Sequence, residues 1–148
     1  MHIYIDGDAC PVREETYKVA RRHNVPVTVV ANQWFRTPPD VTFQRVDDSF
    51  DAADDCIAER ANADAIVVTS DILLADRCLK AGATVLSSNG KEMDDATIGS
   101  QIAVRAIMAD LRDGAEQPNV GGPPPFSDRD RSRFLEKLHL LIETAKRR

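Results

Sequence analysis

The sequence predicts an α/β fold, with a mostly parallel central sheet of about five strands, helices on both faces of that sheet and a further helix at the C-terminus. Three observations support this class. Short runs rich in β-branched residues alternate along the chain with stretches of helical length and periodicity. Parallel neighbours in a sheet require crossovers of this kind between them. The chain has 148 residues, which is enough to bury a core as one domain.

The first half of the chain gives clear strand and helix signals. Residues 2–5 are β-prone, and Pro11 stands where a helix over about 12–23 can begin, because the first helical turn tolerates the missing N–H. Residues 25–31 form a nearly continuous β-branched run, typical of a strand buried on both faces. A loop with two consecutive prolines follows, after which residues 41–46 alternate like a third strand.

The second half continues the alternation with a helix over about 49–62. The apolar run at 65–70 predicts a fourth strand, and Asp71 stands at its end, where the next helix begins. Gly82 ends that helix. Residues 83–88 then predict a fifth strand, which is followed by a short turn.

The expected single domain spans residues 1–148 and has three parts. The α/β body (1–112) ends in a helix over about 94–112 with an apolar stripe of Ile98, Ile102, Ala106 and Ala109. Residues 113–126 are rich in Gly and Pro and predict an irregular strap. In the C-terminal helix (127–148), Ser127 with Asp130 three residues later predicts a capping box. The apolar stripe that should dock this helix on the body comprises Phe134, Leu138, Leu141 and Ala145.

Composition and charge indicate which cellular compartment and which binding partners to expect. No apolar run approaches the ~20 residues that a membrane helix needs, and the three cysteines are far apart with no CxxC spacing, so we expect a soluble, cytoplasmic protein. The net charge of -5 argues against broad attraction to nucleic acid, since phosphate binding depends largely on Lys and Arg. Residues 1–111 carry 18 acidic and 11 basic residues, whereas 112–148 carry 6 and 8. A polyanion would therefore meet the C-terminal part, or Arg13, Lys18, Arg21 and Arg22.

Acidic residues follow two of the predicted strands. Asp6 and Asp8 come directly after the first strand, and Asp71 comes after the fourth. In an open parallel sheet, ligands bind outside the carboxyl ends of the strands, near the point where the strand order reverses. If the first and fourth strands are neighbours, these three carboxylates converge at one edge of the sheet.

A fourth acid comes from the helix at about 49–62. At 100° per residue, Asp54 falls inside the apolar arc of this helix, whereas Asp55 and Glu59 fall on its polar side. A carboxylate on the inward face is costly unless it is protonated, paired with a basic side chain or bound to a metal ion. With other acids nearby and no basic residue at the matching positions, a metal ion is the simplest explanation.

The donor set indicates which metal ion to expect. Clustered carboxylates repel one another unless a cation is present. Oxygen ligands with no nearby His or Cys select Mg²⁺ or Mn²⁺ over zinc. One such ion, or two about 4 Å apart, can lower the pKa of bound water and stabilise the attacking and leaving oxygens in phosphodiester hydrolysis. The expected catalytic and metal-binding residues are Asp6, Asp8, Asp54 and Asp71. Secondary candidates are Asp51, Thr69, Ser70 and Asp76.

Ordinary structural roles compete for several of these acids. Asp is a common helix N-cap, so Asp51 and Asp71 could serve only as caps. The two acids of the turn after the first strand could simply hold that turn through Asx hydrogen bonds. Asp76 lies four residues before Lys80, which favours a solvated ion pair.

Three longer segments together resemble the bacterial YaiI/YqxD family of PIN-like proteins. They are IYIDGDACPV, DAADDCIAERANADAIVVTSDILLADRCLKAGATVL and GGPPPFSDRDRSRFLEKL, which occur in the order and spacing of that family and cover most of the chain. The family is similar to PIN and flap-nuclease domains, so the resemblance implies a Rossmann-like, PIN-type fold and a metal-dependent nuclease site. The implied acids in this chain are Asp6, Asp8, Asp54 with Asp51 close by, and Asp71.

Three functions are compatible with these residues. A metal-dependent nuclease or phosphodiesterase acting on RNA or DNA accounts for the converging acids. A haloacid-dehalogenase-type phosphatase would use Asp6 as nucleophile, Asp8 as acid and Thr69 as its hydroxyl. That chemistry also needs a Lys and a further acidic pair, and Asp94-Asp95 follow a turn instead. A non-catalytic module that binds RNA or a protein partner would keep the acids for structure, which fits the acidic net charge. The sequence indicates no oligomeric state.

Overall fold

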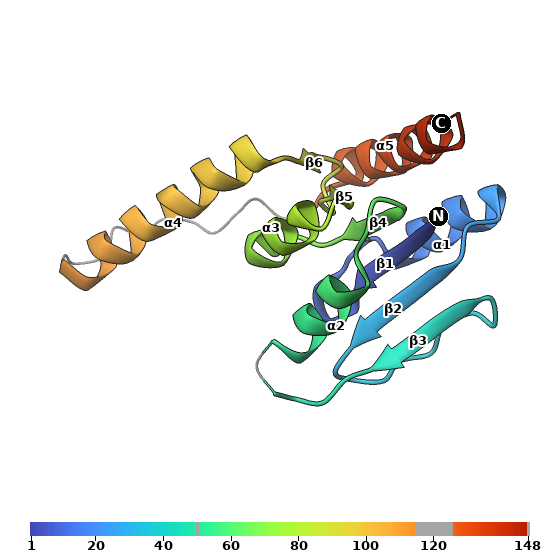
Figure 1. The fold of residues 1–148 in the computed structure, drawn as a ribbon, viewed down its shortest axis with the longest axis horizontal. Coiled ribbons are helices and arrows are strands. Elements are labelled where there is room, and N and C mark those ends of the chain that lie inside the picture. The colour runs from blue at the N-terminus through green and yellow to red at the C-terminus, as the bar shows by residue number, and fades with distance from the viewer. Residues whose placement is uncertain (50, 115–125, 148) are drawn as a thin grey trace.

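A six-stranded sheet runs through the centre of the molecule in the order β3-β2-β1-β4-β5-β6 (Figure 1). The computed structural model describes residues 1–49, 51–114 and 126–147. The strands are β1 (His2–Asp6), β2 (Val27–Ala31), β3 (Val41–Arg45), β4 (Ala65–Val68), β5 (Thr84–Leu86) and β6 (Glu92–Met93). The first five are parallel, and β6 pairs antiparallel with β5. The expected α/β class is confirmed, and the sixth strand, only two residues long, was too short to give a sequence signal.

Helices cover both faces of the sheet, as expected. They are α1 (Arg13–His23), α2 (Ala52–Arg60), α3 (Ile72–Lys80), α4 (Asp95–Gly114) and α5 (Asp128–Lys146), and a single 3-10 turn, η1 (Gly7–Ala9), follows β1. One core joins the sheet to α1 and α5 and includes Ile3, Ile5, Val29, Val68, Phe134 and Leu138. The other joins it to α2, α3 and the start of α4 and includes Val30, Ile57, Val67, Leu74 and Val85. Every residue of β2 is buried, which fits its continuous apolar sequence.

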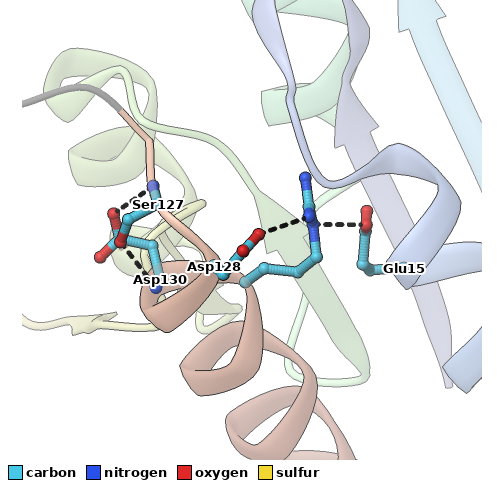
Figure 2. Close-up of polar contacts among 5 residues, drawn as sticks. Glu15, Ser127, Asp128 and Asp130 are labelled. Carbon is cyan, nitrogen blue, oxygen red and sulfur yellow. Dashed lines mark hydrogen bonds and ion pairs between the residues drawn. The ribbon is translucent and has the colours of Figure 1, made fainter.

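The C-terminal helix α5 packs on the face that α1 covers. Its fully buried side chains are Phe134, Leu138 and Ile142, four residues apart, each contributing roughly 1.5–3 kcal/mol by burial. The predicted capping box is present, since the Ser127 hydroxyl accepts from the Asp130 N–H and Asp130 accepts from the Ser127 N–H (Figure 2). Arg131 forms ion pairs with Glu15 of α1 at 2.9 Å and with Asp128 at 3.0 Å. Of the expected stripe, Leu141 and Ala145 are only half-buried, because Ile142 takes the inward position.

Helix α4 leaves the body after its first turn (Figure 1). Of the expected apolar stripe, Ile98 is buried, Ile102 and Ala106 are exposed, and the side chain of Ala109 lies outside the described part. Val104 and Ile107 are exposed as well. The helix also extends to Gly114, two residues into the predicted strap, and the rest of that strap, 115–125, lies outside the described residues. No helix in the described part of the chain has the length and apolar character needed to cross a membrane.

Gly90→Ala should destabilise the fold. Gly90 has a φ of +86°, and a Cβ there would lie 2.6 Å from the Arg133 carbonyl carbon and 2.7 Å from the Phe134 nitrogen in α5. Left-handed backbone strain and overpacking together give an expected loss of about 2–4 kcal/mol in the free energy of unfolding, measured by urea denaturation. Gly99→Ala is the matched control, since its Cβ would meet nothing within 4 Å. Equal stability of the two variants would contradict the packing of α5 against this turn.

Candidate functional site

The centre of the sheet brings the ends of β1 and β4 together. These two strands are parallel neighbours, and the strand order reverses between them, which is where open α/β sheets bind ligands. A pocket of about 550 Å³ lies at this edge. Its lining includes the four predicted acids, Asp6, Asp8, Asp54 and Asp71, together with the secondary candidates Asp51 and Ser70. The other described residues of the lining are Asn32, Asp47, Ser49, Ala52, Ala53, Leu73 and Arg77.

Thr69 links the two central strands beneath the pocket. Its hydroxyl donates to Asp6 Oδ2 at 2.9 Å and accepts from the Asp71 N–H at 3.0 Å. Thr69 itself is buried, whereas its two partners are only partly buried and line the pocket. Thr69 therefore holds the Asp6 carboxylate and the start of α3 in a fixed relation, rather than lining the pocket itself.

Asp8 is held by the neighbouring strand. Both of its carboxylate oxygens accept from the Asn32 N–H, at 3.1 and 3.2 Å, just beyond the end of β2. The preceding Gly7 lets this turn lie close to the sheet, because a Cβ there would come within 2.6 Å of Val29 Cγ1. The 3-10 turn after β1 thus fixes Asp8 against β2, and Asn32 has a positioning role that the sequence analysis missed.

The two predicted caps behave differently. Asp71 does cap α3, since its Oδ1 accepts from the Leu73 N–H at 2.9 Å and the Leu74 N–H at 3.3 Å, but it also lines the pocket. Asp51 makes no side-chain cap bond, and its backbone is left-handed with a φ of 68°. A non-glycine residue in that conformation is uncommon and is often found at functional sites. Capping therefore does not explain Asp51.

The first turn of α2 separates two adjacent acids, as its helical phase predicts. Asp54 lines the pocket, whereas Asp55 points to the outside and pairs with Arg77 at 2.8 Å. Arg77 also lines the pocket, yet its ion pair is with Asp55. Among the described residues, none of the four predicted acids, nor Asp47 or Asp51, has an ion-pair partner. Asp76 lies outside the pocket and forms the expected pair with Lys80 at 2.9 Å.

The pocket holds unbalanced negative charge. Burial, followed by the charges of Asp71, Asp6 and Asp51, raises the pKa of Asp54 to about 6. Burial also raises the pKa of Asp6, with the Thr69 hydrogen bond opposing the shift and Asp71 and Asp8 adding to it. Each of these carboxylates is therefore harder to ionise, first because it is buried and then because its neighbours are charged, and a bound cation would relieve that cost.

The residues present fit a hard divalent cation. All the candidate ligands are carboxylate or amide oxygens, which suit Mg²⁺ or Mn²⁺. No three pocket carboxylates in the described chain bring their oxygens within 4.8 Å of one another, so they do not form a closed cage. Mg²⁺ commonly keeps several waters and is held by only one or two carboxylates in phosphate-handling sites, which suits this open spacing.

The loop that follows the pocket residue Asn32 carries an exposed aromatic residue that was not predicted from the sequence. Trp34, the only tryptophan in the chain, has 68% of its surface exposed and lies two residues after Asn32. The adjacent Phe35 is anchored, because the Arg13 guanidinium lies 3.9 Å from its ring centroid and Phe43 meets it edge-on. The available signal was the position of this segment after the carboxyl end of the second strand.

Comparisons with known proteins place the chain among bacterial relatives. The family model described as "Uncharacterized BCR, YaiI/YqxD family" matches residues 4–144. A "UPF0178 protein" of Sphingopyxis alaskensis is 58% identical over 147 residues, covering 98% of this chain and 95% of the relative. Proteins of the same name from Rhodopseudomonas palustris (strain BisB18) and Jannaschia sp. are each 52% identical, covering 98% and 99% of this chain and 94% and 92% of the relatives. No solved structure matches the chain.

Asp54→Asn should stabilise the metal-free protein above pH 6. The raised pKa means that the ionised carboxylate opposes folding at high pH, and the folded state regains stability by taking up the proton as the pH falls from about 6 towards 4. Because Asp54 is partly exposed and solvent screens its charge, the expected gain at pH 8 is only about 1 kcal/mol. Urea denaturation with a chelator present measures it.

The matched control is the neighbouring Asp55→Asn, which removes the ion pair with Arg77 and should leave stability unchanged or slightly lower. The advantage of Asp54→Asn should shrink below pH 6 and disappear near pH 4. Added Mn²⁺ should stabilise the wild type more than Asp54→Asn. Equal stability of wild type and Asp54→Asn at pH 8 would show that the pocket imposes no charge penalty there.

Proposed function

The chain belongs to the YaiI/YqxD family, and we propose that it is a metal-dependent nuclease or phosphodiesterase that hydrolyses single-stranded nucleic acid, with RNA as the first candidate. One observation carries the proposal. Four carboxylates from three separate segments share one pocket at the strand switch point, and none has an ion-pair partner among the described residues. The resemblance to PIN-like nucleases supports the same chemistry, because those domains use an acidic site of this kind.

Asp6, Asp8, Asp54 and Asp71 would hold Mg²⁺ or Mn²⁺. When bound, such an ion supplies electrostatic stabilisation of the phosphoryl oxygens and lowers the pKa of water. The chain itself supplies positioning, since Thr69 orients Asp6, the Asn32 N–H orients Asp8 and the first turn of α3 orients Asp71. Asp54 is the acid with the most strongly raised pKa in this pocket, so it has the most to gain from a nearby cation.

The loop that follows the pocket residue Asn32 supports a single-stranded substrate. Exposed aromatic rings bind unpaired bases by stacking, and Trp34 is both exposed and carried by an anchored loop. Arg13, Arg36 and Arg45 lie on or against this loop and can meet phosphate groups, with the Arg45 Nε–H donating to the Asn32 carbonyl at 3.4 Å. These arginines supply the local positive charge for phosphate binding that the acidic net charge of the whole chain does not.

The alternative functions have less support. A haloacid-dehalogenase-type phosphatase needs a lysine at its site, and the described pocket lining includes Arg77 but no lysine. That chemistry also needs the Thr69 hydroxyl to face the phosphate, but Thr69 is buried and its hydroxyl donates to Asp6. Asp94 caps α4 through the Thr97 N–H at 2.7 Å and is not part of the lining. A beryllofluoride adduct at Asp6 would favour the phosphatase, and no Mn²⁺ binding below the millimolar range would favour a non-catalytic module.

Asp71→Asn should abolish metal-dependent cleavage. Purified wild type is expected to cleave single-stranded RNA or DNA with Mg²⁺ or Mn²⁺, and loss of this carboxylate should lower kcat/KM by at least about 100-fold. Asparagine caps helices about as well as aspartate, so α3 should remain folded, which circular dichroism checks. Asp76→Asn is the control, since Asp76 pairs with Lys80 away from the pocket. Full activity in Asp71→Asn would remove the mechanism.

Trp34→Ala should weaken substrate binding without disturbing the fold. Stacking contributes about 1–3 kcal/mol per base, so KM for single-stranded RNA should rise roughly tenfold or more while kcat stays nearly constant. Trp34→Phe keeps an aromatic face and should recover most of the affinity. Because the side chain is 68% exposed, neither variant should change the melting temperature. An unchanged KM in Trp34→Ala would rule out a stacking role.

A further inference from the structure

Two histidines that are far apart in the sequence meet between α1 and α5. His23 is the last residue of α1, while His139 and Glu143 are four residues apart on α5 and therefore share one face of that helix. One nitrogen from each imidazole and one carboxylate oxygen of Glu143 all lie within 4.8 Å of one another. Sequence patterns did not reveal this group, because the two histidines share no spacing.

The hydrogen bonds fix which ring nitrogens carry lone pairs. Lys146 Nζ lies 3.1 Å from His23 Nδ1, and an ammonium group can only donate, so His23 Nδ1 is unprotonated. His23 Nε2 then carries the proton and donates to His139 Nδ1 at 2.9 Å. His139 Nδ1 is consequently also a lone pair, and Glu143 Oε1 lies 3.5 Å from His23 Nδ1. In this arrangement the His23 lone pair faces Lys146 and Glu143, whereas the His139 lone pair faces the proton on His23 Nε2. The three groups are thus close together, and one cation, the Lys146 ammonium, is already attracted there.

We propose that His23, His139 and Glu143 bind a divalent transition-metal ion of the zinc class and thereby fasten α5 to α1. Two imidazoles and one carboxylate form a donor set that suits Zn²⁺ and disfavours Mg²⁺. Zn²⁺ holds such ligands at about 2.0–2.2 Å, so the three groups must draw together and Lys146 must withdraw. The His23 ring must also turn, or lose the proton from Nε2 to Nδ1, so that a lone pair faces the ion. His139 and Lys146 are exposed and Glu143 is partly exposed, which leaves them room to move. Burial, then the charge of Lys146, lowers the pKa of His23 and keeps its ring neutral.

The cluster of His23, His139 and Glu143 is separate from the pocket lined by Asp6, Asp8, Asp54 and Asp71, called the acid pocket below. Helix α1 returns the chain from the carboxyl edge of the sheet, after β1, to the amino edge, where β2 begins at Val27. His23 stands four residues before that start, so it lies at the opposite edge of the sheet from Asp6 and Asp71. Zinc binding here is therefore independent of the proposed nuclease chemistry, and either can fail without the other.

The test uses the untagged full-length chain in excess Mg²⁺. Isothermal titration with Zn²⁺ should show one site that Mg²⁺ does not block, and saturating Zn²⁺ should raise the melting temperature, because the ion binds only the folded arrangement. Co²⁺ should give visible absorption bands that report nitrogen and oxygen coordination. His139→Gln and Glu143→Gln should each weaken Zn²⁺ binding by at least roughly tenfold and remove those bands.

Two further variants sharpen the result. Lys146→Met removes the competing ammonium and should strengthen Zn²⁺ binding by up to roughly tenfold. Asp54→Asn alters only the acid pocket and should leave the Zn²⁺ affinity unchanged. His139 and Glu143 lie at the surface of α5, so their variants should fold, and circular dichroism confirms it. Zn²⁺ binding that is equal in wild type, His139→Gln and Glu143→Gln, or that is absent below the millimolar range, would overturn the proposal.

Discussion

The parallel pairing of β1 with β4 is the constraint on which the rest of the site depends. The chain leaves β1 in one direction to build β2 and β3 and later returns to the other side of β1 to build β4 and β5. This reversal leaves the carboxyl ends of the two central strands adjacent and uncovered by a crossover. Thr69 then joins Asp6 to the start of α3 across 63 positions of sequence. Without this register, the acids of the two segments would not share a pocket.

The distribution of ion pairs separates pocket acids from surface acids. Asp40, Asp55 and Asp76 each have an arginine or lysine partner at 2.8–2.9 Å, so the fold readily neutralises acids at the surface. The fold does not neutralise the acids of the pocket with ion pairs, although Arg77 is close enough to contribute to the lining. The result is a raised pKa at Asp54 and a cost to stability that the charge of Arg77 offsets only in part. A cost that is left partly uncompensated is characteristic of functional sites rather than of structural ones.

Local patterns were enough to predict most of the fold and part of the site. The apolar runs of β2 and β4 gave their strands, and helical phase alone separated Asp54 from Asp55, because both depend on periodicity within a few residues. The contacts that local sequence patterns did not predict are long-range. The meeting of His23 with His139 depends on how α5 docks, and the exposure of α4 depends on where the body ends. Neither the histidine contact nor the exposure of α4 depends on the pattern of one segment alone, so hydrophobic periodicity could not predict them.

The position of α5 argues that it acts as scaffold rather than as a lid. None of the described residues that line the acid pocket belongs to α5. The helix instead contacts α1 through Arg131 in its first turn and through His139 just past its middle, and its buried stripe packs on the core that contains Ile5. Ile5 directly precedes Asp6, so packing of α5 restrains the backbone that presents this carboxylate. The C-terminal helix therefore supports the pocket indirectly, by making β1 rigid. It packs on one face of the sheet and does not cover the pocket.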